Sequence, residues 1–440
     1  MTDAGRQLVL PKGLDDVDAA FMTQVLRNSG AIGPSNEVVS QEEQGVGMTA
    51  GYFSAIKKVR CTYREATSAP ATFVVKAWPP FEIAPKETIA AMFAKDIKGY
   101  QFPASRFYPR PNTHLAAFDA PDDRWVLVMD DADSFAQHKV HEHELTLDEV
   151  MKMIPGLVDV AVAWEGCDAG EAAAELSALG VGLWTSPTNL TGFKAAMPGA
   201  AKIFDKLTTM GHSTLIGQPT WDACLGGPGV CEAFTRKIDA FFEPARPDRG
   251  ATCTLSHGDL RGDNIFFCEP SAAFPGGWLC IDFQLMFRGP VPSDLAYLMS
   301  TGSVLPEVYA GENLHRVLRA FYDQFMARTR LYKAYTYERF VDEYAMMTMV
   351  PYTYYLAFGA AYYQEGALNN ALGMRVELGG QGVAEADLAP EETRQRMWWR
   401  KTFANFRENF RTFNLYERLG RLPENLDGLG PWTELPEHLL

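Results

Sequence analysis

The sequence predicts an α+β fold, with a small antiparallel sheet in the N-terminal part of the chain and a larger, mainly helical C-terminal part. Runs rich in β-branched and aromatic residues, separated by turn residues, fill residues 52–63, 71–78 and 125–129, which is typical of strands. Residues 146–245 and 293–370 instead predict series of helices,. A chain of 440 residues can bury a large core and is long enough for two or three domains,.

The N-terminal elements follow one another in a definite order. Residues 14–28 predict a helix that is exposed on one face,. A glycine-rich stretch, residues 44–51, then leads into the first strand. The next strand, residues 71–78, carries Lys76 and is ended by two prolines, because proline cannot donate to a sheet ladder.

A second helix is predicted for residues 85–100, where apolar residues recur at helical spacing,. This apolar stripe consists of Ile89, Met92, Phe93, Ile97 and Tyr100. The strand at 125–129 follows and runs into an acidic segment, residues 130–133. The order of helix, glycine-rich turn, strand, strand with lysine, helix and strand therefore predicts one compact N-terminal unit.

Residues 391–419 predict a late helix with aromatic residues on one face,. The aromatic positions are Trp399, Phe403, Phe406, Phe410 and Phe413. We expect this helix to pack back onto the helical part of the chain, and the alternative is a helix that binds a partner or a membrane surface.

Composition argues against several classes of function. The net charge of −15 disfavours general nucleic-acid binding, which needs a basic face,. Seven cysteines without a C-x-x-C pair indicate neither a zinc site nor a disulfide framework,. The N-terminus lacks the apolar segment of a signal peptide,. We therefore expect a cytoplasmic protein in a reducing compartment.

Residues 344–363 form a run without formal charge that is long enough to suggest a membrane span,. The run contains Pro351 and six tyrosines, and acidic residues flank it. These features favour a buried helix over a membrane span.

The strongest chemical signal is the stretch Ser-His-Gly-Asp-Leu-Arg-Gly-Asp-Asn at residues 256–264. Asp259 precedes Asn264 by five residues, and Asp282 follows the apolar strand at 278–281. Phosphoryl transfer from Mg-ATP needs a carboxylate beside the acceptor hydroxyl, and an Asn and a second carboxylate for the metal ions. The stretch lies between two predicted short strands, residues 253–255 and 265–267. A rigid loop between strands suits such a site.

Three motifs carry a resemblance to a known superfamily. Residues 257–264 have the form HGD-x-x-x-x-N, residues 281–284 read Ile-Asp-Phe-Gln, and residues 294–296 read Asp-Leu-Ala. They resemble the aminoglycoside phosphotransferase and choline kinase superfamily, and within it the ecdysteroid-kinase-like branch. The resemblance covers residues 44–300, is expected to continue to residue 370, and implies a two-lobed protein-kinase-like fold. The implied parts are a nucleotide-binding lobe (1–128), a hinge (129–134) and a catalytic and substrate lobe with a helical extension (135–440).

The resemblance implies ATP and Mg²⁺ as cofactors and gives three residues a catalytic role. Asp259 would sit beside the acceptor hydroxyl and orient it or accept its proton. Asn264 and Asp282 would hold Mg²⁺, a hard ion that prefers oxygen ligands.

Further residues would bind the nucleotide. Gly45 and Gly47 would let backbone N–H groups approach the phosphates, with ordinary turn residues as the alternative. Lys76 would steady the non-transferred phosphates, and a solvated edge-strand lysine is its alternative. A kinase pairs this lysine with a helical carboxylate, and Asp96 is the matching position, with Glu87 as the other candidate.

The resemblance also implies that Met129 and Asp130 belong to the hinge, where backbone groups bind the adenine edge. The family usually has Glu-Asp after the hydrophobic residue, whereas this chain has Asp-Asp. Three histidines with acids at residues 138–144 are interpreted as part of a polar loop rather than a zinc site, because no helical i, i+4 spacing supports one,.

Other residues near the motifs have structural interpretations. His257 is expected to be a packed histidine that shapes the loop. Asp294 is expected to cap the helix that follows it, with Ser293 as a rival for that role. Arg261 would contact a phosphate or pair with an acid. Gln284 replaces the glycine of a protein kinase, so no kinase-style activation switch is expected.

The sequence therefore predicts a small-molecule kinase, a phosphotransferase with an alcohol group as acceptor. A catalytically silent kinase-fold binding or scaffold protein is the alternative, although the predicted catalytic residues are all present. An atypical protein kinase is disfavoured by Gln284 and by the missing Ala-Pro-Glu segment. Tyrosines in the uncharged run could line the acceptor pocket or pack in the core. These are Tyr352, Tyr354, Tyr355, Tyr362 and Tyr363.

Overall fold

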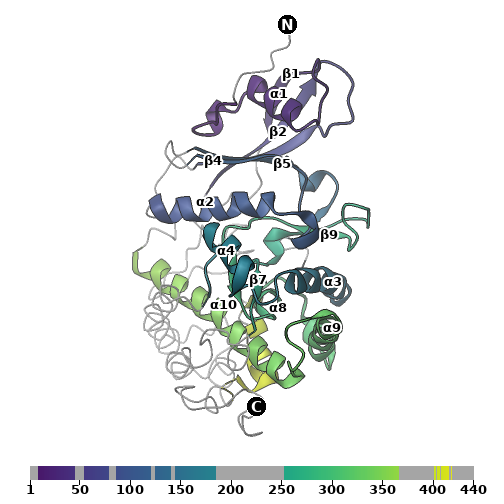
Figure 1. The fold of residues 1–440 in the computed structure, drawn as a ribbon, viewed down its shortest axis with the longest axis vertical. Helices are drawn as coiled ribbons and strands as arrows, with labels where there is room; N and C mark the ends of the chain where they lie inside the picture. The colour runs from purple at the N-terminus through teal and green to yellow at the C-terminus, as the bar shows by residue number, and fades with distance from the viewer. Residues whose placement is uncertain are drawn as a thin grey trace, which may run out of the picture. The chain divides into compact units, whose positions relative to one another are not determined.

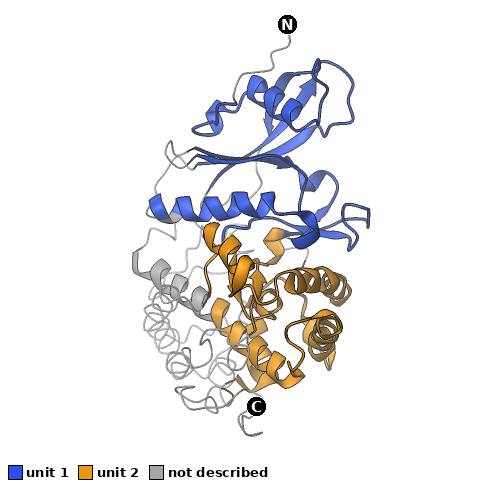
Figure 2. Ribbon diagram, in the orientation of Figure 1, with its two compact units in different colours: residues 1–138, 265–285 blue, residues 139–264, 286–440 orange. Residues whose placement is uncertain are grey.

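The structure is a computed structural model. It describes residues 8–44, 54–78, 86–119, 124–139, 144–184 and 252–365, with side chains to 351 in the last range, and most residues of 401–418. The chain forms two compact units, which Figure 2 colours separately. Unit 1 comprises Met1–His138 and Ile265–Leu285, and unit 2 comprises Lys139–Asn264 and Met286–Leu440.

Unit 1 is built on a five-stranded antiparallel sheet with the order β1-β2-β3-β5-β4. The strands are β1 (Val38–Gln44), β2 (Ala55–Tyr63), β3 (Thr72–Ala77), β4 (Thr113–Asp119) and β5 (Arg124–Asp130). The three strands predicted in this part of the chain are confirmed as β2, β3 and β5. β1 and β4 were not predicted. Most of their side chains are exposed or only partly buried, so neither strand has the pattern of a buried strand.

A helix covers each face of this sheet (Figure 1). Side chains on a strand alternate between faces, so Val126 and Val128 of β5 pack in a cluster with α1 (Ala19–Asn28). Trp125 points the other way and stacks on Phe93 of α2 (Lys86–Gln101), with ring centroids 4.1 Å apart. The predicted apolar stripe of α2 is buried as expected.

The predicted helix at 14–28 is shorter than expected. A 3-10 turn, η1 (Leu14–Asp16), precedes α1, and Asp18 ends the irregular segment by capping the helix. The Asp18 side chain accepts a hydrogen bond of 2.7 Å from the backbone N–H of Phe21, which satisfies one of the free donors of the first turn.

A small three-stranded sheet connects the two chain segments of unit 1, Met1–His138 and Ile265–Leu285. β6 (Gln137–His138), β8 (Ile265–Phe267) and β9 (Trp278–Cys280) pair antiparallel in the order β6-β8-β9. Ile265 at the start of β8 pairs with Cys280 at the end of β9. The chain therefore enters β8 and leaves β9 at the same end of the small sheet.

Unit 2 is mainly helical. Its helices are α3 (Leu147–Ala163), α4 (Gly170–Ala178), α8 (Ser293–Ser300), α9 (Asn313–Arg328) and α10 (Tyr337–Glu365). α3 packs on α9 and α8 packs on α10 (Figure 1). A two-stranded sheet pairs β7 (Thr254–Ser256) with β10 (Phe287–Gly289). The predicted α+β class, with the large sheet early and the helices late, is confirmed.

Short 3-10 turns join these elements: η2 (Ala104–Arg106), η3 (Ala132–Ser134), η4 (Gly262–Asn264) and η5 (Pro306–Tyr309). The uncharged run at 344–363 lies in α10, and its residues 344–350 are buried. Over the described residues, no helix has both the length and the apolar character needed to cross a bilayer.

The described residues between 401 and 418 pack within unit 2 against its other helices, as predicted for the late aromatic helix. Phe406, Phe410 and Phe413 are buried. Asn405 Nδ2 donates to the backbone oxygen of Thr301 at 2.6 Å. Asn409 Nδ2 donates to the backbone oxygen of Met299 at 3.3 Å. These residues therefore hold the C-terminal end of α8.

A tight contact in unit 1 gives a stability prediction. A Cβ added at Gly99 in α2 would lie 2.5 Å from Cβ of Phe283. Alanine would gain about 1 kcal/mol of helix propensity, but such an overlap costs roughly 1–3 kcal/mol. We expect Gly99→Ala to lower the free energy of unfolding, measured by urea denaturation.

Gly33→Ala is the matched control for this variant, because a Cβ at Gly33 has no atom within 4 Å. It should change the free energy of unfolding by less than about 0.5 kcal/mol. A Gly99→Ala protein as stable as the parent would contradict the contact with Phe283.

Candidate active site

The loop at residues 257–264 is largely buried. It follows β7 and ends in η4, directly before β8. Gly258 has a φ of 83°, a backbone conformation that glycine adopts without the steric cost of a side chain. Gly262 also lacks room for a side chain, because an added Cβ would meet the backbone oxygen of Lys139. Both glycines of the motif are therefore explained by the shape of the loop.

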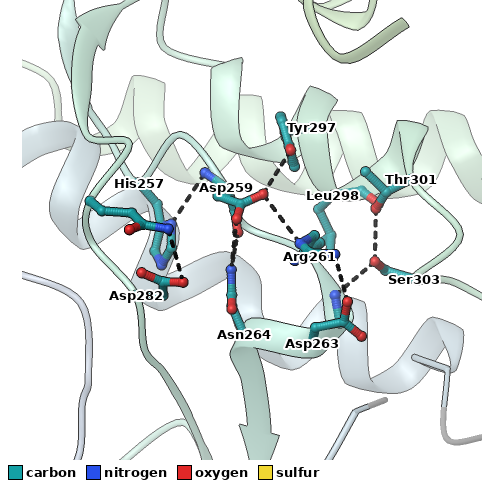
Figure 3. Close-up of polar contacts among 12 residues, drawn as sticks. His257, Asp259, Arg261, Asp263, Asn264, Asp282, Tyr297, Leu298, Thr301 and Ser303 are labelled. Carbon is teal, nitrogen blue, oxygen red and sulfur yellow. Dashed lines mark hydrogen bonds and ion pairs between the residues drawn. The ribbon is translucent and has the colours of Figure 1, made fainter. Parts of the chain in front are cut away.

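Asp259 and Asn264, which were predicted as catalytic residues, contact each other in this loop (Figure 3). Asn264 Nδ2 donates to Asp259 Oδ2 at 3.1 Å and to the backbone oxygen of Asp259 at 2.8 Å. Asn264 uses its amide nitrogen in both contacts, so its amide oxygen is the atom that could ligate a metal. The side chain of Asp259 is only 10% exposed.

Asp259 has further partners in unit 2. The Tyr297 hydroxyl donates to Asp259 Oδ1 at 2.7 Å. Arg261 Nε lies 3.3 Å from the same oxygen, and Arg261 Nη1 lies 2.6 Å from Asp263. Arg261 thus pairs with acids, which was one of its two predicted roles. Tyr297 was not singled out from the sequence.

His257 has the structural role predicted for it. The ring is completely buried, and Nδ1 accepts a hydrogen bond of 3.3 Å from the backbone N–H of Asp259. This contact ties the ring to the backbone of the loop and fits a packed, structural histidine.

The predicted capping role of Asp294 is wrong. α8 begins at Ser293, and the residue before it, Pro292, provides no side-chain cap. Asp294 instead accepts hydrogen bonds from the backbone N–H groups of His257 at 3.0 Å and Gly258 at 3.2 Å. Ser293 donates its hydroxyl to Pro290 and does not cap the helix either. A contact between distant segments outweighs the local capping rule here, because the loop amides need an acceptor.

The segment directly after α8 makes a second contact with the loop. Ser303 Oγ accepts a hydrogen bond of 2.7 Å from the backbone N–H of Gly262, and it is 2.7 Å from Thr301 Oγ1. Figure 3 shows both hydroxyl groups beside the loop. Sequence reasoning missed Ser303, because a serine in a connecting segment carries no recognisable signal.

The Asp294 contacts give a second stability prediction. Asp294→Ala leaves the buried N–H of His257 and the partly buried N–H of Gly258 without their acceptor, and a buried group of this kind costs about 1–3 kcal/mol. We expect the free energy of unfolding, measured by urea denaturation, to fall by roughly 2–4 kcal/mol. Asp159→Ala removes an exposed ion pair to Arg328 and should cost less than about 1 kcal/mol. Equal stability of the two variants would contradict the anchoring role.

Unit 1 brings together three other predicted residues. Lys76 Nζ on β3 lies 3.3 Å from Asp96 Oδ2 and 3.5 Å from Asp282 Oδ1. The predicted pairing of Lys76 with Asp96 is confirmed, whereas Glu87 is exposed. Burial alone would lower the pKa of Lys76, but the carboxylates of Asp282 and Asp96 outweigh this effect and raise it. The lysine is therefore charged at neutral pH.

Asp282 has a left-handed backbone and one carboxylate oxygen that accepts no hydrogen bond. Its φ is 72°, in the left-handed region that non-glycine residues rarely occupy,. Tyr100 accepts from the Asp282 N–H at 3.3 Å, and Asp96 accepts from the Phe283 N–H at 2.8 Å. Gln284 donates to Asp282 Oδ2 at 3.3 Å, but the buried Oδ1 accepts no hydrogen bond. Neighbouring groups thus fix the backbone, and Oδ1 faces the Lys76 ammonium at 3.5 Å without accepting a hydrogen bond.

The charge in this cluster fits a bound divalent cation. Lys76 lies between the carboxyl groups of Asp96 and Asp282, so the cluster holds more acidic than basic side chains, and buried charges are stable when they are paired. Carboxylate oxygen is a ligand that Mg²⁺ prefers. The donor set of Asp282 therefore suits Mg²⁺.

The predicted hinge residues end β5. Met129 pairs with Val74 of β3. The Asp130 N–H donates to the backbone oxygen of Asn112 at 2.9 Å, and its carboxylate lies 2.7 Å from Nε2 of His114. Over the described residues, no group of three His, Cys, Asp or Glu side chains could hold a metal ion.

Several predicted residues lie outside the described parts of the chain. They are Gly45 and Gly47 of the glycine-rich stretch, His141 and His143, Trp399 and Phe403, and the side chains of the five tyrosines in α10.

Comparison with known families agrees with the motifs. Residues 218–334 match the ecdysteroid kinase-like family. This stretch contains Asp259, Asn264 and Asp282. The resemblance seen in the sequence is thereby confirmed.

Solved structures with a similar arrangement are small-molecule kinases of low sequence identity. A GDP complex of an aminoglycoside 2'-phosphotransferase-IIIa mutant is 14% identical with a TM-score of 0.45, covering 81% of this chain and 95% of that one. An amicoumacin kinase is 12% identical with a TM-score of 0.42, covering 82% and 87%. The choline kinase of Streptococcus pneumoniae is 12% identical with a TM-score of 0.37, covering 80% and 99%. No curated protein matches the sequence.

Proposed function

We propose that the protein transfers the γ-phosphoryl group of Mg-ATP to a hydroxyl group of a small molecule. The observation that carries the proposal is Asp282, whose left-handed backbone leaves a buried carboxylate oxygen that accepts no hydrogen bond and lies 3.5 Å from Lys76 Nζ. Such strain persists where a functional group must be held in place. The match to the ecdysteroid kinase-like family over residues 218–334 supports the same reaction class.

The register of the small sheet supports a common role for Asn264 and Asp282. Ile265 pairs with Cys280, and Asn264 is the residue before Ile265, while Asp282 follows Cys280 by two. Asn264 and Asp282 would each serve as a ligand of Mg²⁺, as the resemblance of their motifs implies. When bound, Mg²⁺ would neutralise charge on the phosphate oxygens.

The remaining roles follow from the contacts of each residue. Lys76, held by Asp96, would pair with the non-transferred phosphates. Asp259 would accept a hydrogen bond from the acceptor hydroxyl and orient its oxygen towards the γ-phosphorus. As the new O–P bond forms, the bond from the γ-phosphorus to the bridging oxygen breaks and ADP leaves. The hydroxyl proton passes to Asp259 and then to solvent.

Backbone groups would bind the rest of the nucleotide. Gly45 and Gly47 would approach the phosphates. The backbone around Met129 and Asp130 would contact the adenine edge. These assignments rest on the order of the elements. The glycine-rich stretch precedes β2 and Met129 and Asp130 end β5, and β2 and β5 are the two strands that pair with β3, which carries Lys76.

Binding and turnover measurements test the proposal separately. We expect Mg²⁺-dependent binding of ATP by calorimetry, followed by ATP consumption with one class of alcohol in a metabolite screen. The screen compares steroid-like and aromatic alcohols, choline-like cations, aminoglycosides, sugars and generic protein substrates.

Each outcome has a distinct meaning. Absence of Mg-ATP binding would reject the kinase assignment. Binding without turnover on any acceptor would favour the silent scaffold, and phosphorylation of proteins alone would overturn the small-molecule acceptor.

A further inference from the structure

We infer that Tyr297 is the residue that orients Asp259 for catalysis, an inference that rests on the proposed function. Its hydroxyl donates to Asp259 Oδ1 at 2.7 Å, and both side chains are buried. Figure 3 shows Tyr297 pointing from α8 to the carboxylate.

A single contact would not fix the plane of a carboxylate, because the last torsion of an Asp side chain has a broad energy profile. Asp259 is held at both oxygens. Tyr297 donates to Oδ1, and Asn264 Nδ2 donates to Oδ2 at 3.1 Å. Arg261 Nε adds charge at 3.3 Å from Oδ1. Tyr297 thus supplies the constraint that Asn264 alone would lack.

The position of Tyr297 follows from the spacing of α8. Asp294 and Tyr297 are three residues apart, so they lie on the same face of the helix. Asp294 holds the loop amides before Asp259, and Tyr297 holds the side chain of Asp259 itself. Every residue of α8 from Ser293 to Ser300 is buried. The helix is therefore a fixed base from which both contacts reach the loop.

The hydroxyl group is the part of Tyr297 that matters for this role. A phenylalanine would fill nearly the same space, but it cannot donate to a carboxylate. Hydrogen bonds to an ionised group are shorter and stronger than neutral ones. Removing this one should lower kcat by about 10-fold or more, as judged from the net strength of hydrogen bonds to charged groups.

The test compares Tyr297→Phe with Tyr322→Phe. Tyr322 lies on α9 of the same unit, and its hydroxyl donates to the backbone oxygen of Tyr335 at 2.7 Å, so the control removes the same atom elsewhere. One measurement is kcat and KM with Mg-ATP, using an accepted alcohol or, without one, water as the acceptor and phosphate release as the signal. The other is amide hydrogen exchange of the loop, where Arg261 N–H donates to the Asp259 backbone oxygen at 2.9 Å.

We expect Tyr297→Phe to lower kcat with little change in KM for ATP, and to speed amide exchange in residues 256–264. In an Asp259→Asn background the same change should have no further effect on kcat, because Tyr297 acts through Asp259. Tyr322→Phe should leave the loop exchange and kcat unchanged.

Unchanged loop exchange in Tyr297→Phe would overturn the inference. An equal loss of kcat in the Asp259→Asn background would also overturn it, since Tyr297 would then act by another route. A parent protein that neither binds nor hydrolyses Mg-ATP would reject the kinase proposal instead. In that case loop exchange in Tyr297→Phe still decides whether Tyr297 fixes Asp259.

Discussion

Asp259→Asn should reduce kcat about a thousandfold while leaving the affinity for Mg-ATP unchanged. A positioned carboxylate that accepts a proton contributes about 10²–10⁴-fold. Asparagine has almost the same shape as aspartate. Both oxygens of Asp259 accept hydrogen bonds, one from Tyr297 and one from Asn264, so the amide nitrogen of asparagine would face one of these two donors. The variant loses the charge and one acceptor without losing volume. The measurement is kcat with the accepted alcohol, beside calorimetry of Mg-ATP binding.

The control for this prediction is Asp159→Asn, which removes an exposed acid of α3 that forms an ion pair with Arg328. It should retain the kcat of the parent. Near-parental turnover in Asp259→Asn would exclude Asp259 as the group that orients the acceptor.

Asp282→Asn should weaken Mg-ATP binding by about 100-fold or more, since it removes a charged metal ligand. Asparagine tolerates a left-handed backbone as aspartate does, so the φ of 72° is no obstacle to this variant. Alanine would add backbone strain and confuse the result. Lys76 keeps its ion pair with Asp96 in the variant. Calorimetry across a series of Mg²⁺ concentrations measures the effect.

Asp96→Asn is the comparison that separates the two carboxylates. It removes a partner of Lys76 but no proposed metal ligand, so ATP affinity should fall while its dependence on Mg²⁺ is retained. If Asp282→Asn binds ATP with the Mg²⁺ dependence of the parent, Asp282 does not ligate the metal.

Local chemistry made part of this protein predictable from sequence. β3 and β5 are rich in buried apolar residues, and this apolar composition predicts a strand from the sequence alone. Asp96 was found because a strand lysine and an amphipathic helix define the place of its partner. β1 was missed because its sequence, Val-Val-Ser-Gln-Glu-Glu-Gln, is polar, and its strand conformation comes from pairing with β2.

Contacts between distant segments explain what could not be predicted. Asp294 is 37 residues from His257, so a local capping rule gave it the wrong partner. Tyr297 is 38 residues from Asp259, and nothing within its own helix marks it. Only the packing of α8 against the loop reveals that both side chains serve the same segment.

The contacts of residues 401–418 also bear on when the support of the catalytic loop is completed during protein synthesis. Asn405 and Asn409 hold the carbonyl groups at the end of α8, yet a ribosome adds them 104 and 110 residues after the residues that they contact. Domains fold as the chain emerges from the ribosome. The end of α8 can therefore form its hydrogen bonds to Asn405 and Asn409 only after those residues have been synthesised. A nascent chain that stops before residue 405 would contain the whole catalytic loop and all of α8, but it would lack the hydrogen bonds that Asn405 and Asn409 make to the end of this helix.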